Sequence, residues 1–195
     1  MRKLVYGLFV LVTVPGAASA QNTIREQVLK NGVSEEVVIA EYPTLSVRAL
    51  TAAAGAVVHV AVRSGDTFLS SDGRAVLTDY RVAVVDVVKD SASHLSAGDV
   101  ITVRRVGGRL DVEGRTFLSN EAGFAQFADG AEYVLFLKTD SGQPFEMFAG
   151  PQSAYRVHQG TLTPLTSAGD RTALVPMQAF LGELKEISGR VTGTR

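Results

Sequence analysis

Four arginines gather around a glycine pair in the middle of the chain. Arg104 and Arg105 come shortly before Gly107-Gly108, and Arg109 and Arg115 follow the pair. A concentration of guanidinium groups can bind an anion or a polyanion. Charged side chains on a strand also protect a sheet edge from aggregation, and this second role is the commoner one. Arg104, Arg105, Arg109 and Arg115 are therefore the candidate binding residues, with edge protection as the alternative.

The three histidines do not predict a metal site. His59, His94 and His158 are far apart in the chain, and none has a second histidine two or four residues away. Ligand pairs on one strand or helix need that close spacing, and a carboxylate cluster nearby would support them. Neither is present, so we expect no metal and no cofactor.

Catalytic signatures are also absent from the sequence. A serine hydrolase needs a nucleophile elbow of the Gly-x-Ser-x-Gly type, which does not occur here. Asp86 could meet Asp111 or Glu113 on a sheet face for acid–base catalysis, but solvated strand faces explain these carboxylates better. A hydrolase assembled from scattered carboxylates and histidines is kept as an alternative.

The first 20 residues predict a cleaved signal peptide. Arg2 and Lys3 precede an apolar run over residues 4–14, and Ala18-Ser19-Ala20 fits the small-residue cleavage pattern. The run is shorter than the roughly 20 apolar residues of a membrane-spanning helix. We therefore expect a mature chain that begins at Gln21, inserts in no membrane, and is periplasmic or secreted.

The amino-acid composition excludes several classes of functional site. The chain has no cysteine, which excludes disulfides, thiol nucleophiles and thiolate metal sites. Without the leader, two of the 19 basic residues are lost, and the remaining 17 face 20 acidic residues for a net charge of −3. Tryptophan is absent as well. Nucleic-acid binding needs a basic groove and stacking aromatic rings, so we do not expect it.

One long segment dominates the predicted fold. Val76–Lys89 contains no glycine or proline and is rich in β-branched residues, so it predicts a strand far longer than average. Tyr80, Val82 and Val84 share one face, and a bulge near Val84–Val85 would restore the alternation beyond them. A long curled strand is typical of an OB-like barrel.

The remaining elements complete a mostly β domain. Residues 21–54 predict a helical segment, in which residues 34–39 fit either a helix start or a strand. Residues 55–195 predict the barrel domain, of five to seven antiparallel strands in a closed or curled sheet. The expected strands cover residues 56–63, 100–106, 110–118 and 131–138, with a hairpin over 145–165 and a helix over 176–187. Ser64–Asp66 and Ser70–Arg74 predict turns.

The order of these strands resembles a known group of proteins. It runs through Val57–Val60, Thr78–Val84, Gly98–Arg105, Gly107-Gly108 and Gly130–Leu137. This succession is similar to uncharacterised exported bacterial proteins with an OB-type barrel, and more distantly to the netrin-like domains of tissue inhibitors of metalloproteinases. The resemblance implies the fold and export but no activity. Those inhibitors bind zinc through an N-terminal cysteine, which this chain lacks.

The sequence therefore predicts an exported, non-catalytic binding module. Its barrel loops near residues 64–74 and 104–115 would contact an unknown exported or envelope protein or another ligand, in an unknown oligomeric state. The alternatives are the hydrolase described above and a periplasmic inhibitor or chaperone of an envelope protein.

Overall fold

The computed structural model describes residues 23–91, 93–139, 143–165 and 175–192. The described part is mostly β, with helices α1 (Ile24–Asn31), α2 (Val47–Ala53) and α3 (Met177–Thr192) and a short 3₁₀ turn, η1 (Gly150–Ser153). The strands are β1 (Glu35–Val38), β2 (Ala56–Leu69), β3 (Val76–Asp90), β4 (Val100–Val106), β5 (Gly108–Val112), β6 (Arg115–Glu121), β7 (Glu132–Leu137), β8 (Phe145–Glu146), β9 (Ala154–His158), β10 (Thr161–Pro164) and β11 (Val175–Pro176). The predicted leader, residues 1–20, lies outside the described residues.

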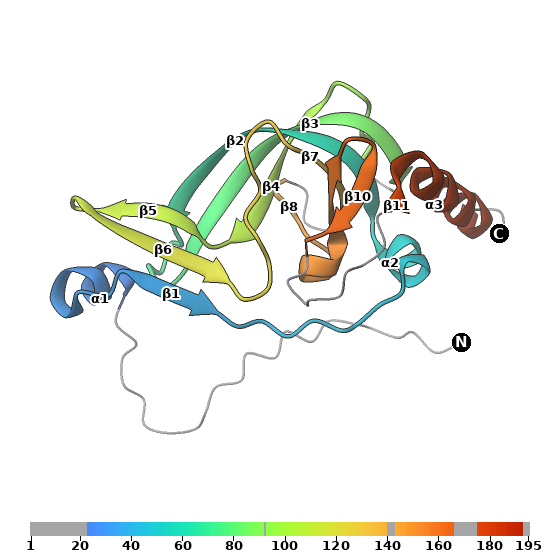
Figure 1. Ribbon diagram of the computed structural model, residues 1–195. Coiled ribbons are helices and arrows are strands. Elements are labelled where there is room, and N and C mark those ends of the chain that lie inside the picture. The colour runs from blue at the N-terminus through green and yellow to red at the C-terminus, as the bar shows by residue number, and fades with distance from the viewer. Residues whose placement is uncertain (1–22, 92, 140–142, 166–174, 193–195) are drawn as a thin grey trace.

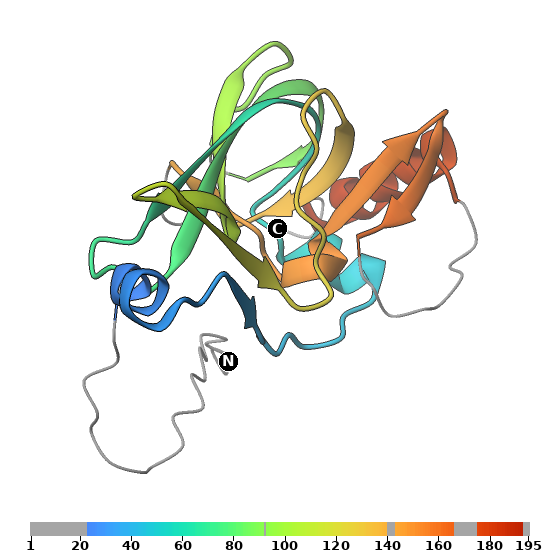
Figure 2. The ribbon, with the colours of Figure 1, turned by 60° about the vertical axis from the view of Figure 1, so that its left-hand side comes forward.

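The strands form two open sheets. The larger has the order β11-β10-β9-β7-β2-β3-β4-β8, and the smaller has the order β1-β6-β5. Figure 1 shows α1, β1 and the β5–β6 hairpin at one end of the long β2–β3 pair, with α2 and α3 at the other end. Figure 2 shows how β2, β3 and β4 curl. The prediction of a mostly β, curled sheet is confirmed, although short strands raise the described number above five to seven.

The long strand and its bulge are both confirmed. β3 runs from Val76 to Asp90 and pairs along its length with β2. The pairing skips Val85, because His59 lies opposite Asp86 while Val60 lies opposite Val84. Val84 is 2% exposed and Val85 is 44% exposed. The bulge therefore turns one valine outward and lets Val87 pack on the same core as Val84.

The predicted turn at Ser64–Asp66 is wrong. β2 continues through these residues to Leu69, and its pairing with β3 skips only Arg63. Gly65 lies opposite Tyr80, and a Cβ on Gly65 would be 3.0 Å from Cε1 of the tyrosine ring. The ring thus covers a glycine that would otherwise weaken the strand. The chain reverses instead at the second predicted turn, between β2 and β3.

The main core fills the inside of the curl. It contains inward residues of β2, β3, β4 and β7 and is capped by Phe124, Phe127 and Phe145, which are at most 6% exposed. β7 lies between β2 and β9, and five of its six residues are buried. This confirms β7 as a central strand with both faces covered, as its continuous apolar run predicts.

A second core lies on the outer face of the sheet, under two helices. The core side of α3 packs together with Leu50 of α2 on Val57 of β2, through Phe180, Leu181 and Leu184. The predicted C-terminal helix is thereby confirmed. Lys89 Nζ donates hydrogen bonds to the carbonyl oxygens of Thr51, Ala52 and Ala54. A lysine of β3 thereby satisfies the free carbonyls at the end of α2.

The N-terminal segment combines helices with one strand. α1 is capped at its start by Thr23, whose side chain accepts from Glu26 N, and at its end by Gly32, which has φ +70°. Residues 35–38 form β1, so the strand alternative holds for this segment, and β1 pairs in parallel with β6. A third core of α1, Val76, Val112 and Phe117 joins this segment to the sheets.

The predicted C-terminal hairpin is only partly correct. β9 and β10 pair around Gln159-Gly160, both of which have positive φ. Phe145–Glu146, expected in the same unit, instead pairs in parallel with β4. None of the helices in the described part of the chain is long and apolar enough to span a membrane.

Substituting each of two adjacent valines tests the bulge. Val84→Asp would leave an unpaired charge in the main core and should cost about 3 kcal/mol or more of unfolding free energy. Val85→Asp places the same charge on the exposed bulge and should cost less than about 1 kcal/mol. Urea unfolding of both variants measures the difference. Equal losses would mean that the two valines do not occupy opposite sides of the sheet.

Candidate functional site

The four candidate arginines have different surroundings. Arg104 forms two hydrogen bonds with the Asp79 carboxylate, at 2.6 and 2.7 Å, and its guanidinium lies 5.2 Å from the centre of the Phe68 ring. Arg115 donates to the carbonyl oxygens of Val28 and Leu29 and so caps the end of α1. Both side chains therefore have internal partners that fix their orientation.

Arg105 is buried rather than presented to solvent. It is 3% exposed, and its guanidinium lies 3.4 Å from the centre of the Phe124 ring and 4.7 Å from that of Phe127. Its Nη1 and Nη2 atoms donate to the carbonyl oxygens of Ala125 and Phe124, at 2.7 and 3.2 Å. Cation–π contacts and these hydrogen bonds replace part of the water that this cation loses, while its Nε is buried without a hydrogen-bond partner among the described residues.

A carboxylate and a tyrosine complete the surroundings of Arg105. Glu121 is also buried, and its Oε2 lies 3.9 Å from Arg105 Nη2. The hydroxyl of Tyr42 donates to Glu121 Oε1 at 2.5 Å. Burial lowers the pKa of Arg105 to about 10, against the opposing effect of Glu121. Burial, together with the bond to Glu121, raises the pKa of Tyr42.

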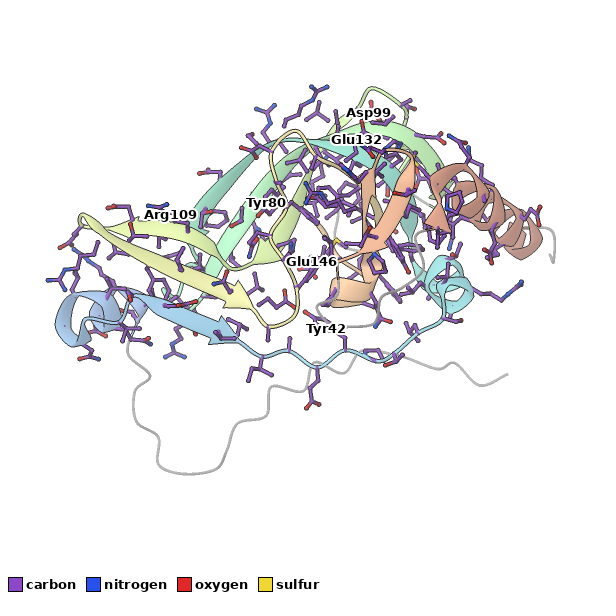
Figure 3. All side chains as sticks on the ribbon, viewed as in Figure 1. Tyr42, Tyr80, Asp99, Arg109, Glu132 and Glu146 are labelled. Carbon is purple, nitrogen blue, oxygen red and sulfur yellow. The ribbon has the colours of Figure 1, made fainter. Side chains whose placement is uncertain are left out.

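Tyr42 ties the connection between β1 and α2 to the rest of the molecule (Figure 3). Its ring lies against Gly150, where an added Cβ would be only 2.4 Å from Tyr42 Cε2. Gly150 has φ +60°, so glycine suits this position both by conformation and by space. The Tyr42–Glu121–Arg105 chain therefore links this connection to β6 and β4. We call it the buried network after its two buried charges, Glu121 and Arg105; Tyr42 is 40% exposed.

An open pocket of about 270 Å³ lies where the β5–β6 hairpin crosses β2 and β3. Arg109 extends from β5 and Tyr80 from β3, as Figure 3 shows. The sequence analysis predicts two binding segments, residues 64–74 and 104–115, and both contribute residues to the pocket. A third segment, from Leu118 to Asp129, also lines it. The residues that line it are Gly65, Thr67, Thr78, Tyr80, Gly108, Arg109, Leu118, Asn120, Gln126 and Asp129.

Hydrogen bonds hold the wall of the pocket in place. The hydroxyls of Thr67 and Thr78 are 2.9 Å apart, and Thr78 Oγ1 donates to Gly107 O at 2.6 Å. Tyr80 donates to Gln126 Oε1 at 2.7 Å. Gly108 permits the crossing, because a Cβ there would be 2.3 Å from Thr78 Oγ1. The wall is therefore built before a ligand binds.

Two side chains of opposite charge are available at the pocket. Arg109 is exposed and makes one long contact, 3.5 Å, from Nη2 to Thr116 Oγ1. Asp129 is also exposed and forms no ion pair within the described residues. Burial raises the pKa of Tyr80, which keeps its hydroxyl a neutral donor. The pocket therefore offers a cation, an anion and polar neutral groups.

The histidines and carboxylates singled out in the sequence do not meet in a cleft. His59 is 5% exposed, and its Nε2 lies 2.9 Å from Glu132 Oε2. Asp86 pairs with Lys185 at 2.9 Å, while Glu113 pairs with Arg25. His94 and His158 are exposed on other elements. Within the described residues, no group of three histidine or acidic side chains could hold a metal ion.

Sequence reasoning missed most of the pocket. Of the four arginines, Arg109 lines it, while Thr78, Asn120, Gln126 and Asp129 carry no motif. One sequence signal for the pocket is available: the polar residues Gln126 and Asp129 follow β6 and alternate with Phe124 and Phe127. These two phenylalanines are buried and turn the segment back over the open sheet. That the four arginines bind a ligand together stays a prediction.

The comparisons add no relative. No known protein-family model and no curated protein matches this chain. The resemblance to exported OB-type barrels and netrin-like domains therefore stays a prediction.

Tyr42→Phe tests the buried network. Loss of the hydroxyl should cost about 1 kcal/mol of unfolding free energy at neutral pH. Because the folded-state pKa of Tyr42 is raised, the unfolded chain ionises first, and this contribution is present below about pH 10 and falls as pH rises further. The difference in unfolding free energy between the parent and the Tyr42→Phe protein should therefore decrease above about pH 10. Urea unfolding at a series of alkaline pH values measures it.

Tyr155→Phe is the matched control. Burial also raises the pKa of Tyr155, but its hydroxyl makes no hydrogen bond with the described residues. This variant should match the parent protein at neutral pH. A Tyr42→Phe protein as stable as its parent at neutral pH, or with a deficit that is constant up to about pH 11, would contradict the network.

Proposed function

We propose that this protein is an exported, non-catalytic binding module that holds a polar ligand in the pocket beside Tyr80 and Arg109. One observation carries the proposal. The pocket draws Gly65 and Thr67 from one predicted binding segment, and Gly108 and Arg109 from the other, into one hydrogen-bonded wall. Binding sites are typically such preformed concave surfaces with a few fixed polar groups.

The groups at the pocket favour a small ligand with two opposite charges. Arg109 would pair with a carboxylate or another anion, and Asp129 with an ammonium group. Asn120 adds an amide whose Nδ2 donates a long hydrogen bond to Glu35 Oε1, at 3.4 Å, and whose oxygen can accept from a ligand. A volume of about 270 Å³ is just below the roughly 300–1,000 Å³ of typical ligand pockets and suits one or two residues of a peptide.

The pocket supports binding better than catalysis. The hydroxyl of Thr78 donates to Gly107 O and that of Tyr80 to Gln126 Oε1. Neither hydroxyl is hydrogen-bonded to a histidine or a carboxylate of the described residues, although Asp129 lines the same pocket. Nucleophilic catalysis needs a nucleophile and a base within hydrogen-bond reach. The His59–Glu132 pair has that reach but is not among the residues of the pocket.

Export belongs to the same proposal. The support comes from the pattern of residues 1–20, in which basic residues precede an apolar run and a small-residue cleavage site. The mature chain would then meet its ligand in the periplasm or outside the cell.

Titration of the mature protein with dialanine tests the pocket. The full chain is expressed with its leader, and the intact mass of the protein recovered from the envelope fraction should correspond to a start at Gln21. Dialanine carries an ammonium, an amide and a carboxylate, and we expect millimolar binding with amide shifts at Thr67, Thr78 and Arg109 in ¹⁵N NMR spectra. The N-acetylated, C-amidated dipeptide lacks both charges and should bind more weakly.

Charge reversal provides the control. Arg109→Glu should weaken dialanine binding at least tenfold, whereas Arg156→Glu, on the exposed face of β9, should leave it unchanged. The proposal fails if dialanine shifts no pocket amide, or if both variants bind it as the parent does.

A further inference from the structure

The strand β1 has one edge that no described strand occupies. It stands at the end of its sheet and pairs with β6 alone among the described strands. The carbonyl oxygens of Ser34 and Val38 accept from Leu118 N and Ala122 N, at 2.9 and 2.8 Å. In a parallel pair, alternate residues direct both backbone groups to the same neighbour. The N–H and C=O groups of Glu35 and Val37 therefore face away from β6.

The side chains along this edge are unusually apolar for a solvent-exposed strand. Val37 is 58% exposed, and Ile39, directly after the strand, is 82% exposed. Leu118 of β6 lies beside Glu35 and is 38% exposed. Natural proteins protect exposed edges with charge, proline or a covering element, because such edges pair readily with another chain. Here the strand is short and begins with two glutamates, but the three residues that follow them, Val37, Val38 and Ile39, are apolar.

Acidic residues surround the apolar centre. Glu35 and Glu36 precede Val37, and Glu41 follows Ile39. No lysine or arginine occurs from residue 31 to residue 47, and none of the three carboxylates forms an ion pair within the described residues. Unpaired like charges on both sides of a strand favour a partner of opposite charge.

We propose that the free edge of β1 binds an extended segment of a partner protein by strand addition, and that this segment is apolar at alternate positions and basic at its ends. Backbone hydrogen bonds to Glu35 and Val37 supply affinity, contact with Val37 and Ile39 selects apolar side chains, and the three glutamates select the basic ends. This surface adjoins the polar pocket at Leu118 and Asn120, which line the pocket and lie beside Glu35 and Val37. The two sites are therefore told apart by different residues, Arg109 for the pocket and Val37 for the edge.

A second copy of this chain is a poor occupant for the same edge. Two β1 strands side by side would bring three carboxylates from each copy to one contact without a neutralising cation. Like charges on adjacent strands are destabilising.

A synthetic peptide provides the probe. It alternates valine with threonine over five residues and carries two lysines at each end, and the control peptide carries glutamates in place of the lysines. The lysine peptide should bind the full mature protein with amide shifts at Glu35 and Val37 in ¹⁵N NMR spectra. The glutamate peptide should bind at least tenfold more weakly.

Val37→Pro removes an N–H that faces the free edge and leaves the pairing with β6 intact, because proline is tolerated on the outer side of edge strands. It should weaken binding of the lysine peptide at least tenfold. Ile39→Lys keeps every backbone donor. It should also weaken binding of the lysine peptide at least tenfold, because the new lysine repels the basic ends of the peptide and the apolar contact is lost. Val85→Lys, at an exposed valine on the β3 bulge, is the matched control and should change nothing.

Three results would overturn the proposal. The first is no shift at Glu35 or Val37 with the lysine peptide, and the second is equal binding of both peptides. The third is a dimer of the protein, seen by analytical ultracentrifugation, that Val37→Pro dissociates, because a second copy would then occupy the edge. If dialanine still binds at the pocket in any of these cases, the proposed function stands without the edge site.

Discussion

The burial of one cation, Arg105, constrains how the open end of the curled sheet is covered. A buried guanidinium costs several kcal/mol unless charges, carbonyls and ring faces replace its water. Arg105 obtains these from Glu121, from two carbonyls of the segment after β6, and from Phe124 and Phe127. These contacts hold that segment over the end of the main core, in which Phe124 and Phe127 are buried.

Both proposed binding surfaces follow from this placement. Gln126 and Asp129, which line the pocket, belong to the segment that Arg105 holds, and the pocket opens beside it. Glu121 ends β6, the strand that supports β1, and it also receives the Tyr42 hydroxyl from the connection beyond β1. The buried network thus positions a polar pocket and an apolar strand edge on one small sheet, although it belongs to neither.

The sequence predicted the features that depend on local pattern. The long β3 strand, its bulge at Val85, the buried β7 and the α3 helix all follow from valine-rich or 3.6-residue periodicity. The turn expected at Ser64–Asp66 fails because Tyr80, distant in sequence, covers Gly65. The pocket likewise could not be predicted, since it depends on where β5 crosses β2 and β3. Local pattern also does not distinguish a buried arginine from an exposed one. The sequence analysis therefore grouped Arg105 with the three other arginines as a candidate binding residue.

Hydrogen exchange in an Arg105→Lys protein tests the role of the buried network most directly. Lysine keeps the charge but loses the planar contact with Phe124 and the paired bonds to the carbonyls. Amide protection should fall at least tenfold in residues 121–127 and in β1, while β2, β3 and β7 keep theirs. Arg104→Lys, on the opposite face of β4, should leave residues 121–127 protected. Unchanged protection in Arg105→Lys, or an equal loss across β2, β3 and β7, would contradict the account.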